Sequence, residues 1–182
     1  MKNQRLGLYR IDIKYVRNLA NVDDRVMSVS PQEGKSSRPF VGVILICDEY
    51  KYCIPMSSPK PKHATMKNDR DFSKIIDKHG KLIGVLNFNS MIPVNDDVIT
   101  PVDIKIKPDD SPKDKAYKGL LNDQLDWCND NRETIINKAN KLYRIVTKNP
   151  DKMIALASRC CDFKKLEKIC DRQIPYSSQA KH

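Results

Sequence analysis

Glycine and histidine are both scarce in this chain of 182 residues, which contains six glycines and three histidines. Neither G-x-x-x-x-G-K nor G-x-G-x-x-G occurs, which argues against the phosphate loops of nucleotide-binding enzymes. No apolar run approaches the roughly 20 residues that cross a bilayer as a helix. Charged residues also interrupt residues 1–15, where an export signal needs an apolar segment. We therefore expect a cytoplasmic protein with no membrane partner.

Metal-binding patterns are missing as well, although the chain has six cysteines. These are Cys47, Cys53, Cys128, Cys160, Cys161 and Cys170. They form no C-x-x-C pair, and two adjacent cysteines are poorly spaced as zinc ligands. In the reducing cytoplasm that we expect, free thiols are favoured over disulfides. No carboxylate cluster suggests a two-metal nuclease, so we predict neither a metal nor a cofactor.

Acidic residues are outnumbered, with 23 Asp and Glu against 33 Lys and Arg, which gives a formal net charge of +10. Two stretches contain no acid at all: one lies between Glu49 and Asp69, the other between Glu133 and Asp151. Each of them carries four basic residues. A solvated surface is the default interpretation of a charged run, but solubility alone is well served by mixed signs. The excess of positive charge therefore indicates a polyanionic partner.

The first half of the chain has the patterns of β-strands. Alternation or continuous β-branched runs predict strands at 8–13, 39–47, 50–55, 82–87, 90–94 and 98–106. A short helix is predicted at 14–19, and polar residues predict loops at 23–37 and 56–71.

The second half has the patterns of helices. Ser111 is a plausible N-cap, Pro112 fits the first helical position, and Asp114 completes a capping-box pattern. A second helix is predicted at 132–148, and Asp151 and Asp162 could cap two shorter ones. Strands followed by helices predict one α+β domain over 1–182, strand-rich at 1–107 and helix-rich at 108–172, with a C-terminal tail at 173–182.

The most informative segment is 54–63, where a strand ends and hydroxyl, amino and imidazole groups follow. Ser57, Ser58, Lys60, Lys62 and His63 lie within a few residues of one another. A serine hydrolase is improbable, because no G-x-S-x-G sequence is present and histidines are few. Lysine and hydroxyl groups suit phosphate chemistry, and RNA supplies its own nucleophile, the 2′-hydroxyl. The alternative is that these residues only decorate a solvated loop.

The sequence resembles the ToxN/AbiQ family, the protein toxins of type III toxin–antitoxin systems. The matching segments are 38–45, 51–60, 82–94, 117–146 and, more weakly, 161–167. The resemblance implies a compact, highly twisted antiparallel sheet of the MazF/Kid-like barrel type, surrounded by helices. It also implies a sequence-selective, metal-independent endoribonuclease that leaves a 2′,3′-cyclic phosphate and acts in phage defence or plasmid maintenance. A repeat-containing pseudoknot RNA, which the toxin processes from a precursor, would inhibit it within a closed protein–RNA heteromer.

The resemblance also assigns residues. The family's hydroxyl–Ser–Pro–Lys motif falls on Ser57, Ser58, Pro59 and Lys60, and its basic residue before the Phe-Val-Gly strand falls on Arg38. Ser58 would be tied to catalysis, Lys60 would stabilise the pentacoordinate phosphate or protonate the leaving oxygen, and Arg38 would stabilise charge.

Basic residues of the two acid-free stretches and of the N-terminal loop are expected to contact RNA. The candidates are Lys35, Lys62, His63, Lys67, Lys138, Lys141, Arg144 and Lys148. For His63, loop decoration is an equal alternative. The competing function is a non-catalytic RNA-binding protein on the same scaffold, which would keep the basic surfaces without the chemistry.

Overall fold

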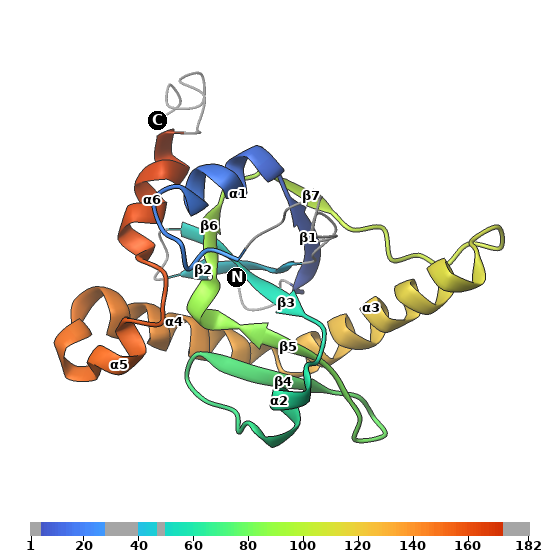
Figure 1. The fold of residues 1–182 in the computed structure, drawn as a ribbon. Coiled ribbons are helices and arrows are strands. Elements are labelled where there is room, and N and C mark those ends of the chain that lie inside the picture. Colours follow the sequence, from blue (N-terminus) through green and yellow to red (C-terminus); the bar gives the residue numbers. More distant parts are fainter. Residues whose placement is uncertain (1–4, 28–39, 47–49, 173–182) are drawn as a thin grey trace.

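The computed structural model describes residues 5–27, 40–46 and 50–172 (Figure 1). Its strands are β1 (Gly7–Ile11), β2 (Phe40–Ile46), β3 (Tyr50–Ser57), β4 (Phe72–Ile76), β5 (Leu82–Asn87), β6 (Ile92–Val94) and β7 (Ile99–Pro101). Its α-helices are α1 (Ile13–Ala20), α2 (Pro61–Thr65), α3 (Pro112–Asp130), α4 (Arg132–Lys148), α5 (Ile154–Ala157) and α6 (Phe163–Arg172). Two short 3-10 helices are η2 (Phe88–Ser90) and η3 (Pro150–Met153). The mixed α+β class predicted from the sequence is confirmed.

Strand β3 is the centre of the sheet, whose order is β4-β5-β3-β2-β1-β7 with every pair antiparallel. Strand β6 also pairs with β3, at Lys51–Cys53, whereas β5 pairs with the last two residues of β3, Met56 and Ser57. Because β3 exchanges one partner for another along this edge, the β4–β5 hairpin diverges from the rest of the sheet. Strands β4 and β7 lie at opposite ends of this order and do not pair with each other, so the described strands do not close into a barrel. The expected MazF/Kid-like barrel is therefore corrected to an open sheet.

The long helices begin where the sequence predicts. The Ser111 hydroxyl accepts a hydrogen bond from the Asp114 N–H over 3.1 Å, and Pro112 is the first residue of α3. Only the C-terminal part of α3 buries side chains, at Leu121, Gln124 and Cys128. The N-terminal part projects away from the sheet as an arm (Figure 1).

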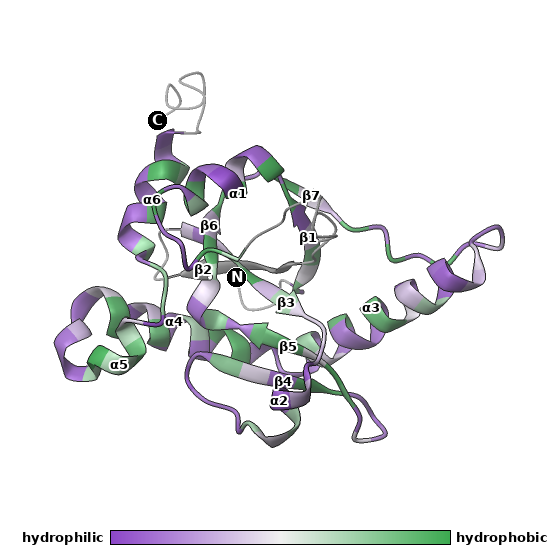
Figure 2. Cartoon of the chain, in the orientation of Figure 1, coloured by the Kyte–Doolittle hydropathy of each residue, from purple (hydrophilic) through white to green (hydrophobic). Residues whose placement is uncertain are grey.

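Strand β5 is largely hydrophobic, whereas the turn between β4 and β5 is hydrophilic (Figure 2). Helix α6 packs on β6, and α4 packs on β2. All cysteines in the described ranges are buried free thiols, and Cys47 lies outside those ranges. Within the same ranges, no helix is long and apolar enough to cross a membrane.

A buried carboxylate ties β3 to the helices. Glu167 of α6 is 3% exposed, and its Oε1 accepts hydrogen bonds from the hydroxyls of Tyr52 on β3 and Tyr143 on α4, over 3.0 and 2.6 Å. Its Oε2 lies 2.9 Å from the Lys164 ammonium. Burial and the carboxylate raise the pKa of Tyr143 to about 12. Strand β3, which ends at Ser57, is thus anchored to both α4 and α6.

We expect Glu167→Gln to lower the free energy of unfolding by about 1–2 kcal/mol, because two charge-assisted hydrogen bonds become neutral ones. For a chain of this length the melting temperature should fall by roughly 2–8 °C. Lys168→Ala is the control and should change little, because Lys168 is an exposed residue of the same helix. An unchanged melting temperature for Glu167→Gln would contradict the anchoring role.

Candidate active site

The candidate site begins where β3 ends. Ser57 is the last residue of β3 and pairs with Val85 of β5. Its Oγ accepts a hydrogen bond from the Asn87 side-chain amide over 3.1 Å, and the same amide donates to the Pro55 carbonyl over 3.4 Å. Asn87 therefore fixes the serine hydroxyl to the neighbouring strand. Nothing in the sequence pattern singles out Asn87, because only strand pairing brings it to Ser57.

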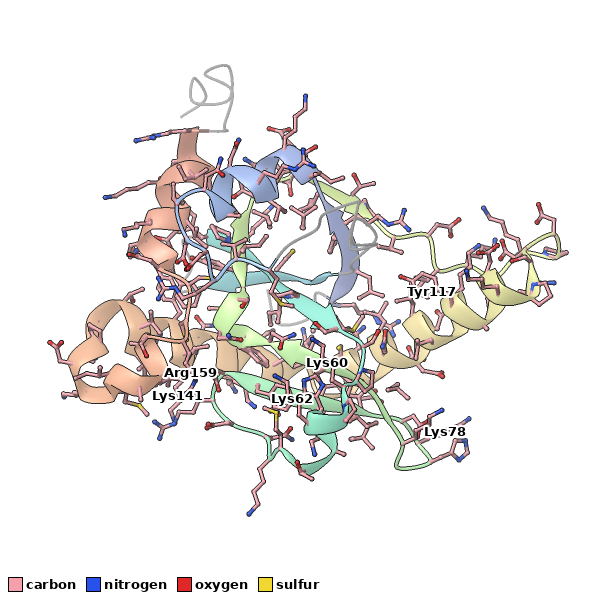
Figure 3. All side chains as sticks on the ribbon, in the orientation of Figure 1. Lys60, Lys62, Lys78, Tyr117, Lys141 and Arg159 are labelled. Carbon is pink, nitrogen blue, oxygen red and sulfur yellow. The ribbon has the colours of Figure 1, made fainter. Side chains whose placement is uncertain are left out.

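The two residues expected to be most directly involved in chemistry follow immediately and face solvent. Ser58 and Lys60 are both exposed. Lys60 stands between Pro59 and Pro61, and its backbone is extended, with φ −116° and ψ 159°. A proline disfavours helical backbone in the residue before it, so Pro61 itself favours this extended conformation. Lys60 is the residue just before α2, and the exposed Lys62 is the second residue of that helix (Figure 3).

The backbone of Lys60 is bonded on both sides to one residue, His63. The Lys60 N–H donates to His63 Nδ1 over 3.0 Å, and the Lys60 carbonyl accepts from the His63 N–H over 2.8 Å. His63 is only 5% exposed, and its ring centroid lies 5.4 Å from that of Phe72 on β4. Burial and the nearby charges of Lys62, Lys60 and Lys74 lower the pKa of His63. This burial fits neither the expected RNA contact nor loop decoration.

Helix α2 and the segment that follows it are hydrogen-bonded to β4. The Lys74 ammonium of β4 donates to the Ala64 carbonyl over 2.9 Å, and the Lys74 N–H donates to the Asn68 side chain over 2.8 Å. Lys67, between these contacts, is exposed. The predicted polar loop at 56–71 thus contains a short helix held against β4, a strand for which the sequence shows no clear pattern. The segment that follows the candidate site is consequently held in place by hydrogen bonds to β4.

Lys138, one of the four basic residues predicted on α4, turns inward. Its ammonium donates to the carbonyls of Asp69 and Phe72, over 2.8 and 3.2 Å, and to the Ser73 hydroxyl over 2.7 Å. It also lies 5.4 Å from the ring centroid of Phe88. Burial lowers the pKa of Lys138, and the carboxylates of Asp69 and Asp71 act in the opposite direction. Its hydrogen bonds join α4 to the start of β4.

The other three residues of the predicted stripe, Lys141, Arg144 and Lys148, are exposed. At about 100° per residue they lie nearly opposite the buried face of α4, whereas Lys138 lies only about a quarter turn from that face. Lys141 also borders a cleft of about 410 Å³ between α4 and residues 68–70. Arg70 lines the same cleft. Arg38 and Lys35 lie outside the described residues.

We expect Lys138→Ala to lower the free energy of unfolding by about 1.5–3 kcal/mol, since the carbonyls at the start of β4 lose a charged donor. Urea unfolding measures this effect. Lys141→Ala is the matched control from the same helix and should stay within about 0.5 kcal/mol of the wild type, as exposed substitutions generally do. Equal stabilities for the two variants would show that the inward hydrogen bonds of Lys138 do not stabilise the fold.

The arrangement is suited to holding a phosphate group. A strand end fixed by pairing presents two neighbouring hydroxyls and, two residues later, an ammonium whose backbone is fixed by His63. Such donors can stabilise negative charge that develops on a phosphoryl oxygen. In the ranges that the structure describes, no three His, Cys, Asp or Glu side chains are grouped so that they could hold a metal ion.

Comparison with known proteins places this chain in a family. The family described as toxin ToxN of the type III toxin–antitoxin system matches residues 7–171, and the chain belongs to it. The endoribonuclease ToxN of Bacillus thuringiensis subsp. kurstaki is 32% identical over 170 residues, covering 89% of this chain and 81% of that protein. The endoribonuclease AbiQ of Lactococcus lactis subsp. lactis is 28% identical over 169 residues, covering 89% and 86%.

Solved structures agree with this assignment. One, from a study of selective toxin inhibition by a non-coding RNA pseudoknot in type III systems, matches with a TM-score of 0.79 and 30% identity. It covers 93% of this chain and 98% of the other. The structure of AbiQ, a lactococcal anti-phage endoribonuclease, matches with a TM-score of 0.78 and 25% identity, covering 96% and 99%. The family resemblance stated from the sequence is confirmed.

Proposed function

We propose that this member of the ToxN family is an endoribonuclease toxin whose active site is the loop after β3. The observation that carries the proposal is the fixed placement of the loop 57–60. Ser57 is bonded to Asn87, the Lys60 backbone is bonded to His63, and the side chains of Ser58 and Lys60 face solvent. Rigid placement of exposed polar groups at a strand end is typical of a reactive site. Its relatives named as endoribonucleases support the same reaction.

The reaction that we propose uses the substrate's own nucleophile. The RNA 2′-hydroxyl loses its proton and attacks the adjacent phosphorus, so that a 2′-oxygen–phosphorus bond forms. The bond from phosphorus to the 5′-oxygen breaks, that oxygen gains a proton, and the other product ends in a 2′,3′-cyclic phosphate. The nucleophile needs orientation and charge stabilisation but no metal-bound water. In this scheme Lys60 stabilises the pentacoordinate phosphate or protonates the leaving oxygen, Ser58 and Ser57 donate hydrogen bonds, and Arg38 adds positive charge.

We further propose that an RNA antitoxin inhibits this toxin. The exposed basic face of α4, which comprises Lys141, Arg144 and Lys148, would contact RNA phosphates, together with Lys62 and Lys67 near the site. A related structure concerns inhibition by an RNA pseudoknot, and another concerns a processed non-coding RNA that regulates an antiviral system. A pseudoknot unit cut from a repeat precursor and held in a closed protein–RNA heteromer would serve here too, in phage defence or plasmid maintenance.

The competing function is RNA binding without cleavage. Incubation of the purified protein with its own repeat precursor RNA separates the two functions. We expect conversion of the precursor to fragments of single-repeat length, followed by retention of those fragments in a complex with the protein. Stable binding of an uncut precursor would instead favour the non-catalytic alternative.

A further inference from the structure

We propose that His63 is a positioning residue that holds Lys60 in its active placement, and that it does so only as a neutral imidazole. The inference rests on the proposed catalytic role of Lys60 and deepens it. It replaces the RNA contact expected for His63 from the sequence.

Lys60 and His63 cap the N-terminus of α2 through two hydrogen bonds, one in each direction. His63 is the third residue of the helix, and Lys60 is its N-cap. In a capping box, a Glu or Gln side chain at this third position accepts a hydrogen bond from the N-cap N–H. Here the imidazole Nδ1 accepts that bond over 3.0 Å, and the His63 N–H donates to the Lys60 carbonyl over 2.8 Å. Both backbone polar groups of Lys60 therefore depend on a single residue.

His63 can fix Lys60 because His63 is itself held. Its ring is buried against Phe72 of β4, and the Phe72 carbonyl accepts a hydrogen bond from the Lys138 ammonium of α4. A continuous set of contacts therefore runs from helix α4 through β4 and the imidazole to the Lys60 backbone. The Lys60 side chain remains in solvent at the end of it.

Protonation would break this arrangement, because an imidazolium carries a hydrogen on both nitrogens and Nδ1 can no longer accept. The charged groups that face His63 are Lys60 and Lys62 from its own segment and Lys74 from β4. Burial disfavours the protonated imidazole, and so do the positive charges of all three lysines. The pKa of His63 therefore lies below the ordinary value of 6.5. The hydrogen bond is therefore intact at neutral pH and is lost only on the acid side, as the pH falls through this lowered pKa.

The test compares His63→Ala with His63→Gln, because Gln restores an acceptor at the capping position without a group that titrates near neutral pH. For single-turnover RNA cleavage at pH 7.5, we expect His63→Ala to lower the rate by about 10- to 100-fold, in line with the cost of a small misplacement. RNA affinity should change by less than about twofold, since phosphate contacts are kept. His63→Gln should recover most of the lost rate. The control His79→Gln, in the exposed turn after β4, should behave as the wild type.

The pH profile separates positioning from other roles. The wild type and His79→Gln should share a fall in rate at acid pH that His63→Gln lacks. If His63→Ala cleaves at the wild-type rate, positioning is excluded. If His63→Gln, although folded, is as slow as His63→Ala, the imidazole acts in proton transfer and the inference is wrong.

Amide hydrogen exchange, which does not depend on RNA cleavage, distinguishes failure of this inference from failure of the proposed function. The Lys60 amide should be protected from hydrogen exchange at pH 7.5 in the wild type and in His63→Gln, and unprotected in His63→Ala. Protection of that amide in a wild type that cuts no RNA would overturn the endoribonuclease proposal and leave the capping geometry standing. An unprotected Lys60 amide in the wild type would overturn the inference itself.

Discussion

Replacing Lys60 by Ala is expected to slow RNA cleavage by about 100- to 1,000-fold, the usual loss when one preorganised donor to a developing oxyanion is removed. The physical reason is that the change removes the ammonium that would stabilise charge on the phosphate, at a position whose backbone is held by His63 and flanked by two prolines. Single-turnover cleavage at saturating protein isolates this step from RNA binding. Lys78→Ala is the matched control, because Lys78 is an exposed lysine in the turn after β4, away from Lys60 (Figure 3).

Ser58→Ala should also slow the chemical step, and by a similar order if its hydroxyl donates to the same oxygen. Neither change should alter thermal stability by more than about 0.5 kcal/mol, because both side chains are exposed. Cleavage at the wild-type rate by both variants would place the chemistry elsewhere in the molecule. Equal slowing by Lys78→Ala would show a general charge effect in place of a specific one.

Reversing the three exposed charges of α4, with Lys141→Glu, Arg144→Glu and Lys148→Glu together, is expected to weaken antitoxin RNA binding by roughly 100-fold or more. Each lost charge pair near a phosphate contributes about 1 kcal/mol in water. The salt dependence gives a sharper readout: the slope of log affinity against log salt should fall by about 2–3, one step of about 0.7–0.9 for each lost phosphate contact.

The control for this variant carries the same change in net charge at a different place. Lys78→Glu, Lys81→Glu and Lys113→Glu are exposed substitutions on the β4–β5 turn and the start of α3. If RNA affinity and its salt dependence fall equally in both triple variants, the α4 face acts only through the total charge of the protein. If the α4 variant keeps the wild-type slope, the face is merely solvated. Lys138 is left out of the test because its ammonium is bonded inside the fold.

Features that depend on nearby residues could be predicted from the sequence. The cap at Ser111 with Pro112 is one example, and the helix at 132–148 is another. Strand β4 was missed because it is short and has a lysine at its centre, and α2 was missed because a five-residue helix has too few residues to show a period. The predicted strand at 98–106 shortens to Ile99–Pro101, where its pairing with β1 ends.

Features that depend on distant contacts could not be predicted. His63 and Lys138 both belong to acid-free stretches and look like surface residues in sequence, yet the fold buries the first and bonds the second to β4. Asn87 reaches Ser57 only through the pairing of β5 with β3. The loop Ser57–Lys60 could be proposed as a candidate site because several groups suited to phosphate chemistry are close together in the sequence itself. Its rigidity comes partly from Asn87, which only strand pairing brings to Ser57, and partly from the local residue His63, which is buried against Phe72 of β4.

The central claim, that the protein cleaves RNA through the 2′-hydroxyl without a metal ion, is tested most directly by cleavage in excess EDTA with analysis of the product ends. We predict that the wild-type protein cuts RNA at an undiminished rate and leaves 2′,3′-cyclic phosphate ends, and that RNA with a 2′-deoxy residue at the cut position stays intact. Cleavage that stops in EDTA, or that continues at the 2′-deoxy position, would contradict the account.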